Sequence, residues 1–234
     1  MMNQPDKMKS ILVNVSANAE WRIVKEYYRP TICSETPFGE WFEERVGETL
    51  VIFLQGGWGK ISAAASTQYA LDRWKPNLLV NLGTCGGFEG AVERGEIILA
   101  EETLVYDIYE RMGDAQEAVD FYTTQIKLDW LDDALPFPVR RTRLLSADRD
   151  IDPVEVEDLR QRFNVLAADW ESGAIAWVAQ RNNVRCLILR AVTDLVASRG
   201  GEAYGALEVF TEGTRQAMTR LLDGLPAVIG ACKM

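Results

Sequence analysis

Between residues 165 and 194 the chain contains two apolar runs separated by a helical pattern, and carboxylates appear where each run stops. The first run is Val165–Ala168, and Glu171 follows it as the helical pattern begins. The second run, Cys186–Val192, is followed by Asp194. Continuous apolar runs are typical of strands buried on both faces of an α/β sheet. Ligands bind to such sheets beyond the carboxyl ends of the strands, so we expect Glu171 and Asp194 to lie in the functional site.

The same alternation of apolar runs and helical patterns extends along the whole chain. Further strands are expected at Ile11–Val15, Thr49–Leu54, Leu78–Leu82, Glu96–Tyr106 and Thr142–Ser146. Helices are expected at residues 19–28, 60–74, 153–163 and 203–225. Residues 107–142 show no regular pattern, and prolines mark a loop near residues 30–37. Strands alternating with helices predict a single α/β domain over residues 1–234, with a mostly parallel or mixed sheet and flexible residues 1–9.

The composition excludes several classes of partner. The net charge is −10 without any basic run, which argues against nucleic-acid binding. No stretch approaches the roughly 20 apolar residues of a membrane span, and residues 1–10 lack the apolar core of a signal peptide. The four cysteines are widely separated in the sequence. Reduced cysteines without CxxC spacing predict a cytoplasmic protein.

The chain contains no histidine. This removes Ser-His and Cys-His catalysis as well as the commonest zinc ligand. Acid–base chemistry must therefore come from Asp, Glu, Lys, Tyr or Cys side chains. We expect neither a metal nor a cofactor.

Two glycine-rich segments follow predicted strands. Gly83–Gly87 could let the backbone approach a ligand, and Thr84 within it offers a hydroxyl to a phosphate or sugar. A tight turn is the simpler interpretation of this segment, and also of Gly56–Gly59. Neither segment has the dinucleotide-binding GxGxxG spacing or a Walker lysine.

Three carboxylates follow predicted strands or open a helix, namely Glu20, Glu171 and Asp194. Taken singly, each could be a helix cap or a solvated acid. The helix macrodipole would keep Glu171 ionised, whereas apolar surroundings would raise the pKa of Asp194 and let it hold a proton. One ionised and one protonated carboxyl group suit acid–base catalysis. Arg190, inside the second apolar run, is interpreted as a buried cation paired with an acid.

Five segments in order carry a resemblance to a known family. They are Ser16–Glu20, Gly57–Ala64, Asn81–Gly87, Ala168–Ala176 and Arg190–Asp194. With these segments the chain resembles the purine nucleoside phosphorylase superfamily and, within it, the 5'-methylthioadenosine/S-adenosylhomocysteine nucleosidases. The similarity runs in register over most of residues 10–225.

The resemblance implies a role for each of several residues. Asp194 would protonate N7 of the leaving purine, and Glu171 would bind the ribose hydroxyls and stabilise an oxocarbenium-like transition state. Glu20 would orient the attacking water, with Thr84 close to that nucleophile. The backbone of Ile151 would read the edge of the purine. The candidate substrate-binding residues are Thr84, Gly86, Asp150, Ile151, Asp169, Trp170 and Thr193.

The resemblance also implies a three-layer sandwich with a central mixed sheet flanked by helices, no metal, and a homodimer. The chain departs from the family at Asp150, where an aromatic residue usually faces the base, and at Trp170, where a methionine usually lines the sugar. The segment Ser16–Ala19 lacks the glycine and arginine with which phosphorylases bind phosphate, which favours water as the nucleophile.

These features predict an N-ribosyl hydrolase that cleaves a purine nucleoside with a modified 5' group. The alternatives within enzymes are a purine nucleoside phosphorylase and a hydrolase of another nucleoside such as futalosine. The alternative outside enzymes is a nucleoside-binding protein that keeps the fold without turnover.

Overall fold

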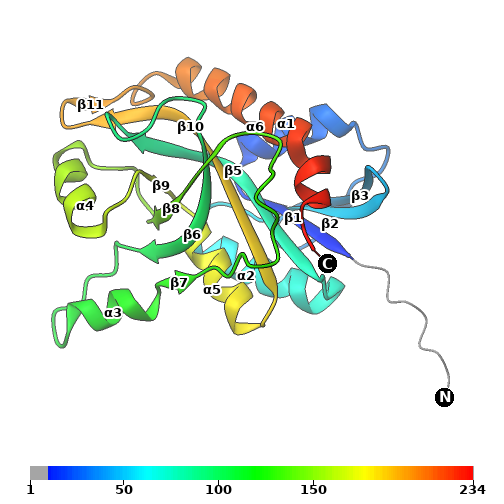
Figure 1. The fold of residues 1–234 in the computed structure, drawn as a ribbon, viewed down its shortest axis with the longest axis horizontal. Coiled ribbons are helices and arrows are strands. Elements are labelled where there is room, and N and C mark those ends of the chain that lie inside the picture. Colours follow the sequence, from blue (N-terminus) through cyan, green and yellow to red (C-terminus); the bar gives the residue numbers. More distant parts are fainter. Residues whose placement is uncertain (1–9, 234) are drawn as a thin grey trace.

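The computed structural model describes residues 10–233, which form a mixed α/β fold (Figure 1). The strands are β1 (Ile11–Val15), β2 (Ser34–Glu35), β3 (Glu40–Val46), β4 (Thr49–Gln55), β5 (Leu78–Phe88), β6 (Ile97–Val105), β7 (Thr124–Gln125), β8 (Val139–Ser146), β9 (Ala167–Asp169), β10 (Arg185–Ala197) and β11 (Gly200–Gly201). The helices are α1 (Asn18–Tyr28), α2 (Gly59–Trp74), α3 (Ala115–Phe121), α4 (Val156–Phe163), α5 (Ser172–Arg181) and α6 (Leu207–Gly230), with a 3₁₀ turn at Pro153–Glu155 before α4.

The strands form one mixed sheet that closes on itself in its middle part. Their order is β11-β10-β6-β8-β9-β5-β1-β4-β3-β2, and β7 pairs with β6. Strand β10 pairs in parallel with β5 and antiparallel with β6. Five strands (β5, β9, β8, β6 and β10) therefore make a closed ring, and β1, β4, β3 and β2 extend from it as an open sheet.

Helices cover both faces of the sheet, as Figure 1 shows. Helices α1 and α6 pack against each other on one face, where they bury residues such as Trp21 and Leu221 against β1 and β5. Helices α2 and α5 pack together on the other face, where Ala63 and Ile175 meet the opposite side of the same strands. The mixed sheet between two helical layers confirms the predicted fold class. The expected flexibility of residues 1–9 concerns residues outside the described range.

Two strands are longer than the sequence predicted. Strand β5 was expected to stop at Leu82 but continues through the glycine-rich segment to Phe88, so this segment is neither a turn nor a loop. Strand β10 was expected to stop before Asp194 but continues to Ala197, with an irregular register between Val192 and Asp194. Both extensions follow from ring closure, because β5 and β10 satisfy each other's backbone groups over their full length.

The glycines of β5 allow close packing inside the ring. A Cβ atom at Gly83 would overlap the guanidinium of Arg190 and lie 2.9 Å from Glu20 Oε1. A Cβ atom at Gly87 would lie 2.6 Å from Val92 and 2.8 Å from Val192. These glycines therefore make room for closely packed neighbours and do not form a turn.

Local sequence patterns failed to predict some helices and strands and placed the bounds of others incorrectly. Strand β2 lies within the loop expected near residues 30–37, strand β3 follows in a stretch with no predicted element, and α3 lies within residues 107–142, where no pattern was seen. Helix α3 is short and is capped by Asp114, whose side chain accepts a hydrogen bond of 2.8 Å from the Gln116 amide. The last helix spans Leu207–Gly230 rather than residues 203–225, which leaves residues 203–206 free to line the site described below.

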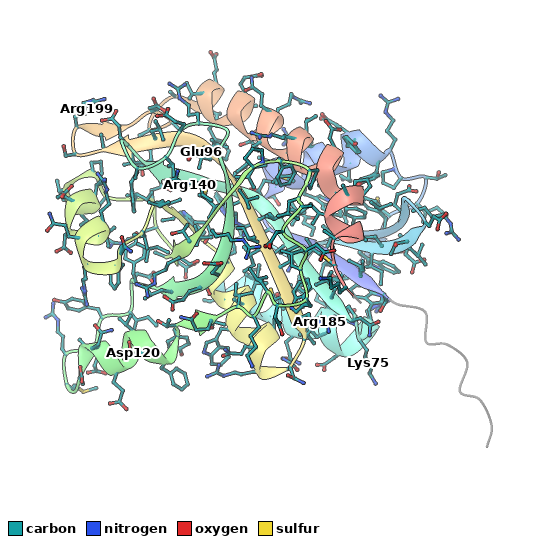
Figure 2. The ribbon with its side chains drawn as sticks, viewed as in Figure 1. Lys75, Glu96, Asp120, Arg140, Arg185 and Arg199 are labelled. Carbon is teal, nitrogen blue, oxygen red and sulfur yellow. The ribbon has the colours of Figure 1, made fainter. Side chains whose placement is uncertain are left out.

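Charged side chains lie mainly at the periphery, as Figure 2 shows for Lys75, Asp120 and Arg199. Arg190 is buried instead, at only 1% exposed, and so are the acids Glu20, Glu102, Asp169, Glu171 and Asp194. Among residues 10–233 no helix has the combination of length and apolarity that crossing a membrane requires.

Candidate active site

A cavity of about 460 Å³ opens where β5, β9 and β10 meet the first turns of α1 and α5. All ten predicted site residues line it, although they come from five different parts of the chain. They are Glu20, Thr84, Gly86, Asp150, Ile151, Asp169, Trp170, Glu171, Thr193 and Asp194. The structure thus brings together every catalytic and substrate-binding candidate from the sequence.

Glu20 lies in the first turn of α1 and is buried within the cavity lining. Its Oε1 atom accepts hydrogen bonds from the Thr84 amide (2.6 Å) and from the Thr84 hydroxyl (2.8 Å). Its Oε2 atom accepts a bond of 3.3 Å from the Ala17 amide. Burial raises the pKa of Glu20, and the nearby Arg190 opposes that rise. Glu20 is therefore fixed in position and able to exchange a proton.

A buried ion pair joins Asp169 to Arg190 below the cavity. Arg190 Nε donates to Asp169 Oδ2 at 2.6 Å, and Arg190 Nη2 donates to Asn81 Oδ1 at 2.6 Å. Asp169 also accepts bonds from the hydroxyl groups of Ser146 (2.6 Å) and Ser172. This confirms the interpretation of Arg190 as a buried, paired cation. The Asp169 carboxylate thus has hydrogen-bond partners for both oxygens. It holds Arg190 and the first residue of α5 in place while it lines the cavity.

Glu171 precedes α5 but does not cap it with its side chain. Instead, Glu171 Oε1 accepts a hydrogen bond of 3.1 Å from the amide of Gly59, the first residue of α2. Burial, followed by the negative charge of Asp169, raises the pKa of Glu171 to about 8. The expectation that the helix macrodipole keeps Glu171 ionised is therefore wrong. Desolvation opposes the dipole and shifts Glu171 toward its protonated form.

Asp194 lies inside β10 at the irregular register, which turns its side chain into the cavity lining. Its Oδ1 atom accepts a hydrogen bond of 2.6 Å from the hydroxyl of Thr193. Burial raises the pKa of Asp194, and the acidic neighbours Glu202 and Asp150 add to that rise. The predicted direction of this shift is confirmed. Asp194 is thus a carboxyl group whose surroundings favour the protonated form.

The segment 149–151 forms another wall of the cavity. The carbonyl of Ile151 accepts a hydrogen bond of 2.6 Å from the hydroxyl of Tyr204, which joins this segment to the residues before α6. Arg149 is paired with Glu155 through bonds of 3.3 and 2.5 Å. Asp150 is exposed to solvent at the same wall.

Two tryptophans stack on each other at the cavity. The rings of Trp58 and Trp170 lie 5.6 Å apart with an interplanar angle of 21°. Trp170 was singled out from the sequence, but Trp58 was not. Tyr204, Leu207 and Phe210 also line the cavity and were missed. Trp58 has a recognisable signal, an aromatic residue between two glycines, whereas the other three follow no pattern that points to a site.

The described lining is rich in acids and poor in cations. Arg149 is its one basic residue, while Arg22 is exposed on α1 and does not line the cavity, as its position two residues after Glu20 predicts. Within residues 10–233 no group of three or more His, Cys, Asp or Glu side chains is arranged to hold a metal ion.

Comparison with known proteins identifies the family. The family model described as "Phosphorylase superfamily" matches residues 18–229. The chain belongs to the phosphorylase superfamily. This match covers most of the chain and confirms the resemblance expected from the five sequence segments.

Two bacterial nucleosidases are similar to this chain in sequence. The 5'-methylthioadenosine/S-adenosylhomocysteine nucleosidase of Bacillus subtilis is 28% identical over 186 residues, which is 74% of this chain and 79% of the relative. The enzyme of the same name from Halalkalibacterium halodurans is 28% identical over 196 residues, covering 77% of this chain and 82% of the relative.

Solved structures of superfamily members share the fold. The Helicobacter pylori 5'-methylthioadenosine/S-adenosylhomocysteine nucleosidase with butyl-thio-DADMe-Immucillin-A has a TM-score of 0.79 at 14% identity, covering 95% of this chain and 100% of the other. The Neisseria meningitidis nucleosidase in complex with methylthio-immucillin-A has a TM-score of 0.74 at 20% identity, covering 94% and 98%.

Proposed function

We propose that this protein is an N-ribosyl hydrolase that cleaves the glycosidic bond of a purine nucleoside with a modified 5' group. The observation that carries the proposal is that one cavity collects Asp194, Glu171 and Glu20, all buried carboxyl groups with raised pKa values. Perturbed acids gathered in a cleft are typical of acid–base catalysis. The nucleosidase names of the curated relatives point to the same reaction.

Asp194 would act as the general acid. As the bond between C1' and N9 breaks, its electron pair moves onto the purine, and the Asp194 proton passes to N7 to neutralise the leaving base. Asp194 can hold this proton because burial, and then the negative charges of Glu202 and Asp150, raise its pKa. Proton donation to the leaving group lowers the barrier to bond cleavage.

Glu171 and Glu20 would act on the sugar and the water. The Glu171 carboxyl group would bind the ribose hydroxyls and, when ionised, offset positive charge developing at C1'. Water would attack C1' and lose a proton to Glu20. Thr84 already donates two hydrogen bonds to Glu20, so the carboxylate would be held ready for that proton.

Water rather than phosphate would be the nucleophile. Phosphate binding requires cations or clustered amides that replace the solvation of a dianion. Arg149 is the one cation in the described lining, and it is paired with Glu155. The neighbouring carboxylates would repel phosphate.

An assay of product identity tests this function. Adenosine, inosine, 5'-methylthioadenosine and S-adenosylhomocysteine would be incubated with the protein at zero to tens of millimolar phosphate. We expect free base and free ribose, or 5'-substituted ribose, at a rate independent of phosphate. A sugar 1-phosphate, or a rate proportional to phosphate, would make the protein a phosphorylase. Bound nucleoside that stays intact would make it a binding protein.

Homodimer formation and a cytoplasmic location, both expected from the sequence, stay predictions. Exposed apolar side chains at Ile61, Tyr109 and Met112 support association with a second copy. Light scattering of the purified protein measures the oligomeric state.

A further inference from the structure

A short hairpin at the end of β10 is joined to the backbone beside Asp194. Strand β11 pairs antiparallel with β10 at Val196 and Ala197, and Glu202 follows β11 directly (Figure 1). The amide of Glu202 donates a hydrogen bond of 3.0 Å to the carbonyl of Leu195, the residue after Asp194. Any force on the hairpin is therefore passed to the backbone that carries Asp194.

A side chain replaces one of the backbone hydrogen bonds expected at this position. In an antiparallel pair, residues that lie opposite each other exchange two backbone hydrogen bonds. Here the amide of Leu195 donates instead to the Glu202 carboxylate, with 2.9 Å between the nitrogen and Oε2. The register between β10 and β5 shifts just before this point, between Val192 and Asp194. Glu202 thus holds the backbone of β10 immediately after the irregularity that carries Asp194.

Glu202 is also half of an ion pair with the segment that precedes β6. Arg94 Nη2 lies 3.0 Å from Glu202 Oε1, and the two side chains are 60% and 33% exposed. That segment is itself fixed to β10. The Gly95 amide donates to the Val192 carbonyl (2.8 Å), and the Val192 amide donates to the Glu96 carbonyl (2.9 Å). One oxygen of the Glu202 carboxylate therefore holds β10, while the other binds a cation.

Titratable groups from several parts of the chain lie around Asp194. They are Cys85 on β5, Arg94 before β6, Asp150 after β8, and Glu202 and Tyr204 after β11. Burial raises the pKa of Asp194, and the hydrogen bond from the Thr193 hydroxyl lowers it. The negative charges of Glu202 and Asp150 add to the rise, whereas the positive charge of Arg94 reduces it. Glu202 and Arg94 therefore act on Asp194 with opposite signs, although they form one ion pair.

We propose that Glu202 is a positioning residue for Asp194, which orients the Asp194 carboxyl group by holding Leu195 and faces it with a negative charge that Arg94 partly offsets. This inference rests on the proposed role of Asp194 as general acid. Small displacements of a catalytic group lower the rate strongly, and a proton donor must keep its proton at the working pH. One carboxylate outside the cavity lining would meet both needs.

Two substitutions separate the positioning role of Glu202 from its charge. Glu202→Gln removes the charge but keeps a side-chain oxygen that can accept the Leu195 hydrogen bond, so kcat at the pH optimum should stay within about twofold of wild type. Glu202→Ala removes both, so kcat should fall about tenfold at every pH, with little change in KM because Glu202 does not line the cavity. Equal kcat values for the two variants would overturn the positioning role.

The titration of Asp194 in the free protein measures the effect of the charge. Nuclear magnetic resonance of isotope-labelled aspartate carboxyl groups follows it, and the Asp194 signal is identified by its absence in Asp194→Asn. Without the negative charge Asp194 loses its proton more easily, so Glu202→Gln should lower the pKa of Asp194 by about 0.5, and Arg94→Gln should raise it by about as much. The alkaline limb of kcat/KM should move in the same directions. Both shifts should shrink in about 1 M salt, because salt screens exposed charges.

Glu89→Gln is the matched control. Glu89 forms another exposed ion pair, with Arg199 in the turn between β10 and β11, and is not among the charges that act on Asp194. Its kcat and its Asp194 titration should equal those of the wild type. Shifts in the same direction for Glu202→Gln and Arg94→Gln, or no shift in either, would overturn this inference while hydrolysis stands. A wild type that cleaves no nucleoside would refute the proposed function instead, and the Asp194 titration would still decide whether Glu202 and Arg94 act on it.

Discussion

The two ends of the cavity are built differently. At the end where we propose that the sugar binds, around Glu20 and Glu171, the acids are buried with Arg190, and hydrogen bonds from several elements fix them. At the end where we propose that the base binds, around Asp194, the hydrogen bond comes from the adjacent Thr193, and burial together with the acidic Glu202 and Asp150 raises the pKa.

This difference matches the chemistry each end would perform. A developing positive charge is best stabilised by groups that are already oriented, because no energy is then spent on reorganising them. A proton donor needs surroundings that keep its proton until the leaving group requires it. Arg190 serves the first task by holding Asp169 in position through their ion pair. For the second task, burial raises the pKa of Asp194, and Arg190 is not among the groups that lower it.

The largest effect should come from the base end. Asp194→Asn keeps the shape of the side chain but cannot donate a carboxyl proton, so kcat should fall about 10²–10⁴-fold. Steady-state kinetics measures this, with circular dichroism to verify the fold. Asp120→Asn, a change at an exposed acid on α3, is the control and should leave kcat unaltered. A kcat above half of the wild-type value for Asp194→Asn would remove Asp194 from the mechanism.

A smaller and more selective effect should come from the sugar end. Glu171→Gln retains hydrogen bonding but cannot become an anion, so it should harm ribosides about tenfold more than 2'-deoxyribosides. The deoxy compounds already lack part of the interaction. The ratio of kcat/KM values for the two sugars, compared between wild type and variant, measures this. Equal losses on both sugars would contradict contact between Glu171 and the 2'-hydroxyl.

The smallest effect should appear in stability rather than in catalysis. The pKa of Glu171 is about 8 in the folded protein and near its ordinary value of 4.5 when unfolded. The folded state therefore binds more protons between these values, and stability should decrease as pH rises from about 5 to 8. Glu171→Gln removes this contribution, so its Tm should fall less than that of the wild type over the same range. Parallel Tm curves for the two proteins would show that Glu171 titrates normally.

The sequence predicted which residues line the site better than it predicted the geometry of the strands that hold them. Glu20, Glu171 and Asp194 could be singled out because each follows a predicted strand or opens a helix, and the family resemblance added Ile151. The continuation of β5 through Gly83–Gly87 could not be predicted, because glycines usually interrupt a strand and the reason for them, the guanidinium of Arg190, lies more than 100 residues away.

The protonation of Glu171 and the contacts between distant segments could not be predicted from local sequence patterns either. The position of Glu171 before a helix predicts an ionised acid, but its pKa depends on burial by residues from several elements. The bond between Tyr204 and the carbonyl of Ile151 joins segments that no periodicity links. Long-range packing decided each of these features.

Ring closure by β10 has a consequence for the order in which the protein becomes active. Strand β10 lies near the end of the chain, yet it pairs with β5 at the centre of the sheet. Such distant pairing is slow to form because a long loop must close first. A growing chain that has not reached residue 190 lacks both Asp194, the proposed proton donor, and the cation that fills the space beside Gly83. The proposed active site and the centre of the fold are therefore completed in the same late step of synthesis.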